Sequence, residues 1–154
     1  MKDTLLMAID LGTSFIKAGV YNAAGECLVT ESAPVKDSRP APGVFIQKGE
    51  DLFASVLDCA RKACAQLGEK AKLVEAISFT GQMSGFMGVD KDWNDITTWS
   101  CSLDSRYMPY AERQMAELSD LFLRVGGTNF PQMAPKYPGS RRNSPKRAAR
   151  SPNT

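Results

Sequence analysis

Residues 7–21 read Met-Ala-Ile-Asp-Leu-Gly-Thr-Ser-Phe-Ile-Lys-Ala-Gly-Val-Tyr, and this stretch decides the fold. The apolar run over residues 5–9 predicts a β-strand that carries Asp10 into a turn at residues 12–14, from which a second strand returns. The stretch therefore predicts a β-hairpin with a carboxylate at the end of its first strand.

The turn of this hairpin has the chemistry of a phosphate-binding loop. Gly12 has no side chain to block a close approach, and Thr13 and Ser14 supply hydroxyl groups and backbone amides. Asp10 can orient a hydrated magnesium ion, because Mg²⁺ usually keeps several waters and takes few carboxylates. Lys17 adds a cation, although a lone Lys on a strand is also an ordinary solvated residue. An ordinary hairpin has the same pattern, so the rest of the chain has to decide.

The composition is that of a globular protein. The chain has 154 residues, of which 43% are hydrophobic and 23% charged, and this predicts one domain with its own core. No apolar run approaches the ~20 residues of a membrane span, and the N-terminus lacks a signal-peptide pattern. We therefore expect a cytoplasmic protein with no membrane partner.

Four cysteines and the absence of histidine limit the chemistry. The spacing of Cys27, Cys59, Cys64 and Cys101 matches no zinc site, so we expect buried thiols. Without histidine, the usual Ser–His and Cys–His nucleophiles are excluded. Chemistry on this chain has to use carboxylates, hydroxyls, cations and backbone dipoles.

The predicted elements follow the order strand, strand, strand, helix, strand. Residues 26–32 predict the third strand. Residues 50–67 have helical apolar spacing, with Phe53 among the apolar positions, and this pattern ends at Gly68. Residues 73–80 predict a buried strand parallel to the first, with the helix as crossover. Shorter elements are predicted as strands at 86–89 and 96–99 and as two helical pieces over 110–118 and up to 125. This order opens the α/β ribonuclease-H-like (actin-like ATPase) fold, a mixed sheet with flanking helices, of which only an incomplete part is expected here.

Three motifs in register with this order carry a resemblance to a known family. They are Ala8-Ile-Asp-Leu-Gly-Thr-Ser14, Thr80-Gly-Gln-Met-Ser-Gly85 and Leu103-Asp-Ser-Arg106. With them, the chain resembles the N-terminal part of the FGGY family of carbohydrate kinases over residues 5–136. The resemblance implies ATP-dependent phosphoryl transfer to a hydroxyl of a sugar or polyol, with magnesium bridging the phosphates. ATP, magnesium and a small sugar or polyol are thus the expected ligands.

The resemblance also implies roles for individual residues. In the family, one group of residues binds the phosphates, with Asp10 holding a magnesium ion through water. A second group lines the sugar pocket. For cofactor binding the residues are Asp10, Gly12, Thr13, Ser14 and Lys17, and for the substrate they are Gln82, Met83, Ser84, Asp104 and Arg106. Each of the two pocket motifs also has an ordinary structural interpretation. Residues 81–85 fit a glycine-flanked turn that closes a strand, and Asp104 and Arg106 fit a surface Asp and an Arg at a helix start. Many family members have histidine or glutamate where Ser84 stands, so the sugar is not identified.

Residues 137–154 differ in composition from the rest of the chain. They hold five basic and no acidic residues, which leaves 14 basic and 17 acidic residues before them. Three prolines and no aliphatic residue larger than alanine predict disorder from Tyr137 onward. We expect a partial kinase domain over 1–136 and a basic tail over 137–154, and our hypothesis for the tail is an out-of-frame extension.

Two functions from different classes follow. The first is a carbohydrate kinase by family, with this chain alone inactive, because the general-base aspartate is expected from a later region of such domains. No catalytic residue is therefore assigned. The alternative is a non-catalytic module that binds a kinase subunit, or a polyanion through its basic tail. Nucleic acid is otherwise not an expected partner, and a homo-oligomer is left open for a full-length form.

Overall fold

The computed structural model describes residues 4–128, which fall into two compact units. The first unit is formed by residues up to 37 and 48–82, and the second by residues 38–47 and those from 83 onward. Residues 137–154, for which the sequence predicts disorder and an alternative role in polyanion binding, lie outside the described residues.

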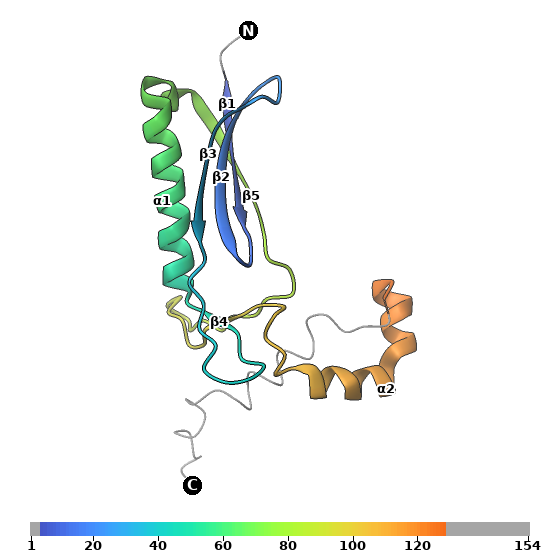
Figure 1. Cartoon of the computed structure of the whole chain (residues 1–154). Coiled ribbons are helices and arrows are strands. Elements are labelled where there is room, and N and C mark those ends of the chain that lie inside the picture. Colours follow the sequence, from blue (N-terminus) through green and yellow to red (C-terminus); the bar gives the residue numbers. More distant parts are fainter. Residues whose placement is uncertain (1–3, 129–154) are drawn as a thin grey trace. The chain divides into compact units, whose positions relative to one another are not determined.

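The first unit is a four-stranded mixed sheet with one long helix on it (Figure 1). Its strands are β1 (Leu5–Leu11), β2 (Phe15–Asn22), β3 (Cys27–Pro34) and β5 (Val74–Gly81), in the spatial order β3-β2-β1-β5. The β1–β2 and β2–β3 pairs are antiparallel, whereas β5 runs parallel to β1. The predicted hairpin, third strand and parallel crossover are all confirmed.

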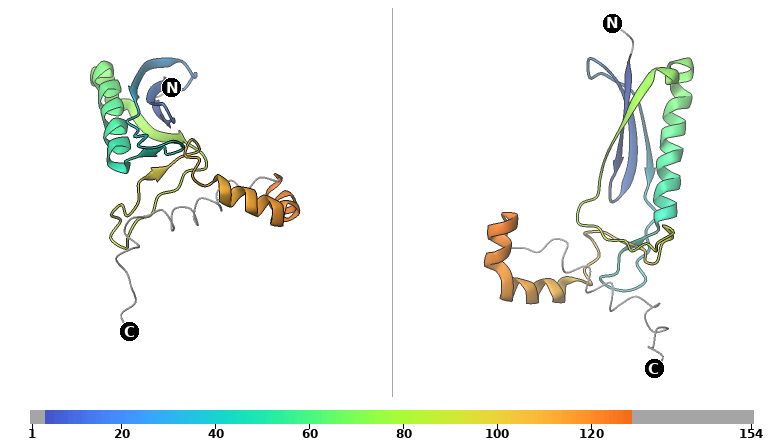
Figure 2. Two further views of the ribbon diagram at one scale, coloured as in Figure 1. Left: turned by 60° about the horizontal axis from the view of Figure 1, so that its bottom comes forward. Right: turned by 180° about the vertical axis from the view of Figure 1, so that it is seen from behind.

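Helix α1 (Gly49–Leu67) covers one face of this sheet, as the views in Figure 2 also show. It packs mainly on β2 and β3. The core alternates along the strands, with Met7 and Ile9 of β1 and Ile16 of β2 buried against the helix. Full burial of such an aliphatic side chain contributes about 1.5–3 kcal/mol, so this face accounts for much of the stability of the unit.

The helix ends where the sequence predicts, but the predicted burial of two side chains, Phe53 and Cys27, is wrong. Gly68 follows the last helical residue with a φ of 57°. Phe53, placed on the apolar face by its spacing, is 65% exposed, because the helix buries the line Val56, Cys59 and Ala63 instead. The expectation of buried thiols also fails at Cys27, which is exposed on β3, a strand at the edge of the sheet.

The prediction that residues 73–80 form a buried strand is wrong in its burial. A short 3₁₀ helix, η1 (Gly68–Leu73), leads into β5, and nearly all of β5 is exposed. β5 lies at one edge of the sheet. Helix α1 packs mainly over β2 and β3, away from that edge. An apolar run predicts a strand, but its burial depends on which neighbours cover it.

The second unit contains a small two-stranded sheet and a long helix. Strands β4 (Ile46–Gln47) and β6 (Trp99–Ser100) pair antiparallel. The predicted strands at 86–89 and 96–99 appear mainly as isolated bridges, Phe86 to Ser100 and Val89 to Asp95. The two predicted helical pieces are one helix, α2 (Met108–Gly126), because no proline or glycine interrupts the chain between Tyr110 and Val125.

Candidate functional site

The turn between β1 and β2 forms the phosphate-site candidate of the first unit. Asp10 is partly buried near the end of β1, Thr13 is partly buried in the turn and Ser14 is exposed. A side chain at Gly12 has no room, because its Cβ would lie 2.6 Å from the carbonyl oxygen of Phe15. The absence of a side chain at Gly12 therefore allows the tight turn, as the sequence suggests.

Strand register brings three polar side chains into one row beside this turn. Asp10 is the cross-strand partner of Lys17 on β2 and of Thr80 on β5. Directly paired residues point to the same face of a sheet, and here that face is opposite the one on which Ile9 packs against α1. Asp10 and Lys17, both predicted for cofactor binding, are thus adjacent. Thr80 was not among the predicted site residues, although it opens a quoted motif at the end of the parallel strand.

Gln82 is tied to the same turn. Its backbone N–H donates to the carbonyl oxygen of Leu11 at 3.0 Å, and its side-chain Nε2 donates to the carbonyl oxygen of Gly12 at 3.1 Å. These bonds connect the end of β5 to the β1–β2 turn across 70 residues of sequence. The side chain predicted to line a sugar pocket therefore holds the turn in place through its amide nitrogen.

Met83 and Ser84 belong to the second unit. Met83 is 80% exposed, and Ser84 adopts a left-handed φ of 59°. The next residue, Gly85, packs directly under the indole of Trp99, because a Cβ there would lie 1.8 Å from Cζ2 of the ring. A left-handed serine costs of order 1 kcal/mol and is found where the surroundings fix the backbone.

Asp104 and Arg106 form a buried ion pair in the second unit. Asp104 is only 1% exposed, and Arg106 Nε donates to its Oδ1 at 2.9 Å and to its Oδ2 at 3.1 Å. Arg106 Nη2 contacts Oδ2 as well, and the backbone N–H of Arg106 donates to Oδ1 at 3.1 Å. The sequence predicts that Arg106 binds the substrate. In the structure, its guanidinium donates to Asp104.

The electrostatics of this pair keep both partners charged. Burial alone would raise the pKa of Asp104, but the hydrogen bonds and the charge of Arg106, with a backbone hydrogen bond from Phe45, outweigh it and lower this pKa. The hydrogen bond from Arg106 to Asp104 raises the pKa of Arg106. The Arg106 side chain remains 35% exposed, so it is the member of the pair that solvent or a ligand can reach.

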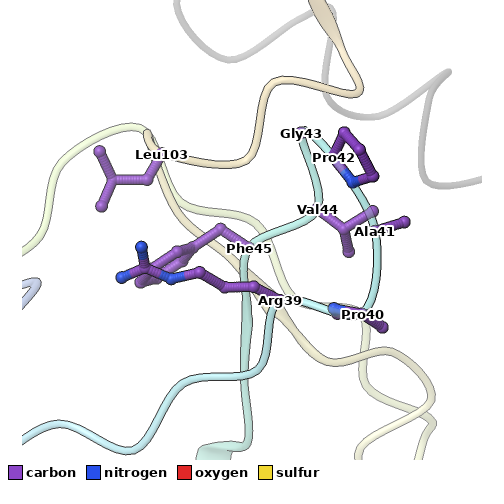
Figure 3. A pocket seen from close by; sticks show the side chains of 8 residues that line it. All are labelled: Arg39, Pro40, Ala41, Pro42, Gly43, Val44, Phe45 and Leu103. Atoms are coloured by element: carbon purple, nitrogen blue, oxygen red, sulfur yellow. The ribbon is translucent and has the colours of Figure 1, made fainter.

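A loop over residues 39–45 forms a surface cavity of about 630 Å³ next to this pair (Figure 3). Its wall includes Leu103, and the guanidinium of Arg39 lies over the ring of Phe45 at 4.7 Å from its centre. The loop is held to the Asp104 turn, because the N–H of Ser105 donates to the carbonyl oxygen of Gly43 at 2.9 Å. Sequence reasoning missed this cavity, since the prolines and glycine of the loop predict only a connection.

The described residues offer few other sites. Among residues 4–128, no group of three or more His, Cys, Asp or Glu side chains could hold a metal ion directly. Over the same residues, no helix has the length and apolar content needed to cross a bilayer. Asp10 is a single, partly buried carboxylate, which fits a magnesium ion that keeps most of its waters.

Comparison with solved structures defines the class of fold. The chain superimposes on the xylulose kinase of Rhodospirillum rubrum with a TM-score of 0.84 and 19% identity, covering 92% of this chain and 30% of that one. It superimposes on the glycerol kinase of Plasmodium falciparum, solved with ADP, with a TM-score of 0.82 and 15% identity, covering 96% of this chain and 30% of that one. These likenesses confirm the actin-like ATPase fold, of which the chain covers a part.

Comparison with sequences gives the family. The model of the FGGY family of carbohydrate kinases, N-terminal domain, matches residues 5–132, and the chain belongs to this family. It is 34% identical over 77 residues to the glycerol kinase of Geobacter sp. (strain M21), covering 50% of this chain and 16% of that protein. It is 25% identical over 120 residues to the xylulose kinase of Bacillus subtilis, covering 78% and 24%. The chain thus spans less than a quarter of these relatives.

Proposed function

We propose that this chain supplies the phosphate-binding hairpin and part of the sugar pocket of a kinase that transfers the γ-phosphoryl group of ATP to a hydroxyl of a sugar or polyol. The observation that carries the proposal is the row of Asp10, Lys17 and Thr80 on one sheet face. This row lies beside a turn whose position 12 has room only for glycine. A carboxylate, a cation and a hydroxyl gathered at a loop of backbone amides suit a phosphate chain with its metal.

The hairpin residues divide the work on the nucleotide. The backbone amides and hydroxyls of Thr13 and Ser14 bind phosphate oxygens, and Lys17 offsets their charge. Asp10 orients the waters of a magnesium ion, which when bound neutralises charge on the phosphates. Gln82 keeps the turn in its binding geometry through its bond to the Gly12 carbonyl.

The sugar side of the site rests on the second motif and on the buried pair. Gln82, Met83 and Ser84 follow the end of β5, and we propose that each of them, and Arg106, contributes to sugar binding. Asp104 orients the guanidinium of Arg106, whose exposed part donates to sugar hydroxyls. The shape of this pocket, with a serine at position 84, selects among sugars and polyols.

We further propose that these 154 residues alone do not catalyse phosphoryl transfer. None of the residues assigned here has the position of a general base for the acceptor hydroxyl, a contribution typically worth 10²–10⁴-fold in rate. Such a base is expected from a later region of FGGY domains. Because the reaction consumes ATP, we place it in the cytoplasm.

The domain boundary proposed from the sequence has one supporting observation. The family match ends at residue 132, four residues before Lys136, after which the composition changes. The out-of-frame hypothesis for residues 137–154 is tested on the gene. Translation of the other two frames after the Lys136 codon should recover a family-like helix, and its absence from both frames would refute the hypothesis.

The function is tested by ³¹P NMR of magnesium–ATP in the presence of the chain. We expect the phosphate lines to broaden, and we expect Asp10→Asn to abolish most of this broadening. The matched control is Asp58→Asn, which removes an exposed carboxylate paired with Lys62 on α1. Equal broadening by both variants would contradict the proposal. A coupled assay over pentuloses, hexuloses and polyols should give no product with the chain alone.

A further inference from the structure

The Asp104 carboxylate is held by two groups of the second unit. The guanidinium of Arg106 donates from Nε to Oδ1 at 2.9 Å and to Oδ2 at 3.1 Å. The backbone N–H of Phe45 donates to the same carboxylate. Since Asp104 is only 1% exposed, little water competes with these bonds. The position of the carboxylate therefore depends on a loop far away in the sequence.

The turn between Asp104 and Arg106 is held by the same loop. The N–H of Ser105 donates to the carbonyl oxygen of Gly43 at 2.9 Å, and its hydroxyl Oγ donates to the same oxygen at 3.3 Å. Gly43 has a left-handed φ of 76°, and a Cβ there would lie 2.7 Å from Oγ of Ser105. Both the backbone conformation and this contact therefore favour glycine at position 43.

The loop over residues 39–45 has a defined shape of its own (Figure 3). Its base is closed by two backbone hydrogen bonds between Ser38 and Ile46, at 2.9 and 3.1 Å. Two prolines restrict its backbone. Phe45 is buried, and the guanidinium of Arg39 lies over its ring. A loop closed in this way can hold the Asp104 turn in one position.

We infer that the 39–45 loop positions the guanidinium of Arg106, with Gly43 and Phe45 as positioning residues. Phe45 holds the carboxylate to which Arg106 donates, and Gly43 holds the backbone of Ser105, the residue before Arg106. The inference rests on the proposed function in one respect, because Arg106 is there proposed to bind sugar hydroxyls. The loop then sets the direction in which these hydrogen bonds are donated, and so takes part in the choice of sugar.

The first test follows the Nε–H proton of Arg106 by NMR in the full chain and needs no sugar. Gly43→Ala places alanine in a left-handed conformation against Ser105, and we expect exchange of this proton with water to rise about fivefold or more. The control is Gly127→Ala in the same unit, where φ is also left-handed, at 70°, but nothing lies within 4 Å of the Cβ. It should leave the exchange rate of Arg106 unchanged.

A merely structural effect is detected at a reference amide. The N–H of Ser100 donates to the carbonyl oxygen of Phe86 at 2.9 Å in the same unit, so its exchange reports general loosening. A positioning role predicts that Gly43→Ala raises exchange at Arg106 relative to Ser100. An equal rise at both sites, no rise at all, or the same rise in Gly127→Ala would overturn the inference.

A milder pair of variants gives the decision if circular dichroism shows that Gly43→Ala does not fold. Ser105→Ala removes the hydroxyl bond to Gly43 and keeps the N–H bond, so it should raise Arg106 exchange about twofold. Ser102→Ala, at an exposed position of the same segment, should not. Equal rates in these two variants would contradict the positioning role.

The role of Arg106 in the proposed function is tested separately, with the pentulose D-xylulose and the polyol glycerol as probes. Either compound should shift the Arg106 Nε–H signal of the wild-type chain, and Gly43→Ala should weaken this binding about fivefold. No shift with either compound in the wild type would refute sugar binding by Arg106. The exchange comparison decides the positioning by the loop in either case.

Discussion

Two motif aspartates of this chain have opposite surroundings. Asp104 is almost completely buried, and Arg106 holds its carboxylate through three side-chain contacts. Asp10 is only partly buried and lies in an open row with Lys17 and Thr80, on the sheet face opposite α1. Both residues stand in motifs of the same kinase family, yet their carboxylates are available to very different degrees.

Under the proposed function, this difference assigns Asp104 a positioning role and Asp10 a binding role. The oxygens of Asp104 are engaged by Arg106, so its charge serves to orient a guanidinium. Asp10 is only partly buried, on the sheet face opposite α1, and we propose that it binds hydrated metal beside the phosphates. We therefore expect changes at the Asp104 pair to affect stability first, and changes at the Asp10 row to affect ligand binding first.

The largest expected effect tests this comparison directly. Arg106→Met leaves the Asp104 carboxylate buried without its counterion and should cost about 2–3 kcal/mol of the stability of the second unit. Lys17→Met, beside the open Asp10, should cost less than about 0.5 kcal/mol. Urea unfolding followed by tryptophan fluorescence measures the first variant, since Trp93 and Trp99 both belong to the second unit. Far-UV circular dichroism measures the second variant. Similar costs for the two variants would break the comparison.

Gly12→Ala should have the next largest effect. The added methyl group would meet the Phe15 carbonyl oxygen at 2.6 Å, so the turn has to open at a cost of about 2 kcal/mol, and broadening of the ATP lines should be lost. Gly126→Ala is the control, because nothing lies within 4 Å of its Cβ and alanine favours the helix. Unchanged hydrogen exchange at the hairpin amides of Gly12→Ala would show that the turn is not constrained as described.

The pH dependence distinguishes the units further. Because folding lowers the pKa of Asp104, its contribution to stability is present above its unfolded pKa of about 3.9 and is lost as the pH falls through the lower, folded value. Tryptophan-detected stability should therefore fall steeply below about pH 4 in the wild type. In Asp104→Asn this fall should be shallower. Parallel curves for the two proteins would exclude Asp104 as the titrating group.

Gln82→Ala should have the smallest effect of these. It removes the hydrogen bond to the Gly12 carbonyl, at a cost of about 1 kcal/mol to the first unit, and should weaken ATP binding without abolishing it. Gln66→Ala removes a surface contact with Glu31 and should cost less than about 0.5 kcal/mol. An equal effect of both substitutions on ATP binding would leave no positioning role for Gln82.

The elements that could be predicted from the sequence are those fixed by local pattern. The β1–β2 hairpin follows from alternation and a glycine turn, and α1 follows from apolar spacing that ends at Gly68. The parallel pairing of β1 and β5 follows from the helix between them. Each depends on residues close in the chain or on a strong rule of connection.

The errors concern burial and contacts between distant segments. Exposure of β5 and Phe53 depends on which elements cover them, and an apolar run does not reveal its neighbours. Asp104 accepts a backbone hydrogen bond from Phe45, a loop residue some sixty positions earlier, and Arg39 stacks on the ring of the same phenylalanine in the cavity wall. Thr80 enters the Asp10 row only through strand register.

The central claim is that the β1–β2 turn binds nucleotide phosphate, and amide chemical-shift mapping tests it most directly. In ¹⁵N-labelled chain titrated with magnesium–ATP, we predict the largest shifts at Gly12, Thr13 and Ser14, with smaller ones at Lys17 and Gln82, and their loss in Asp10→Asn. Shifts confined to other regions, or hairpin shifts that persist unchanged in Asp10→Asn, would contradict the account.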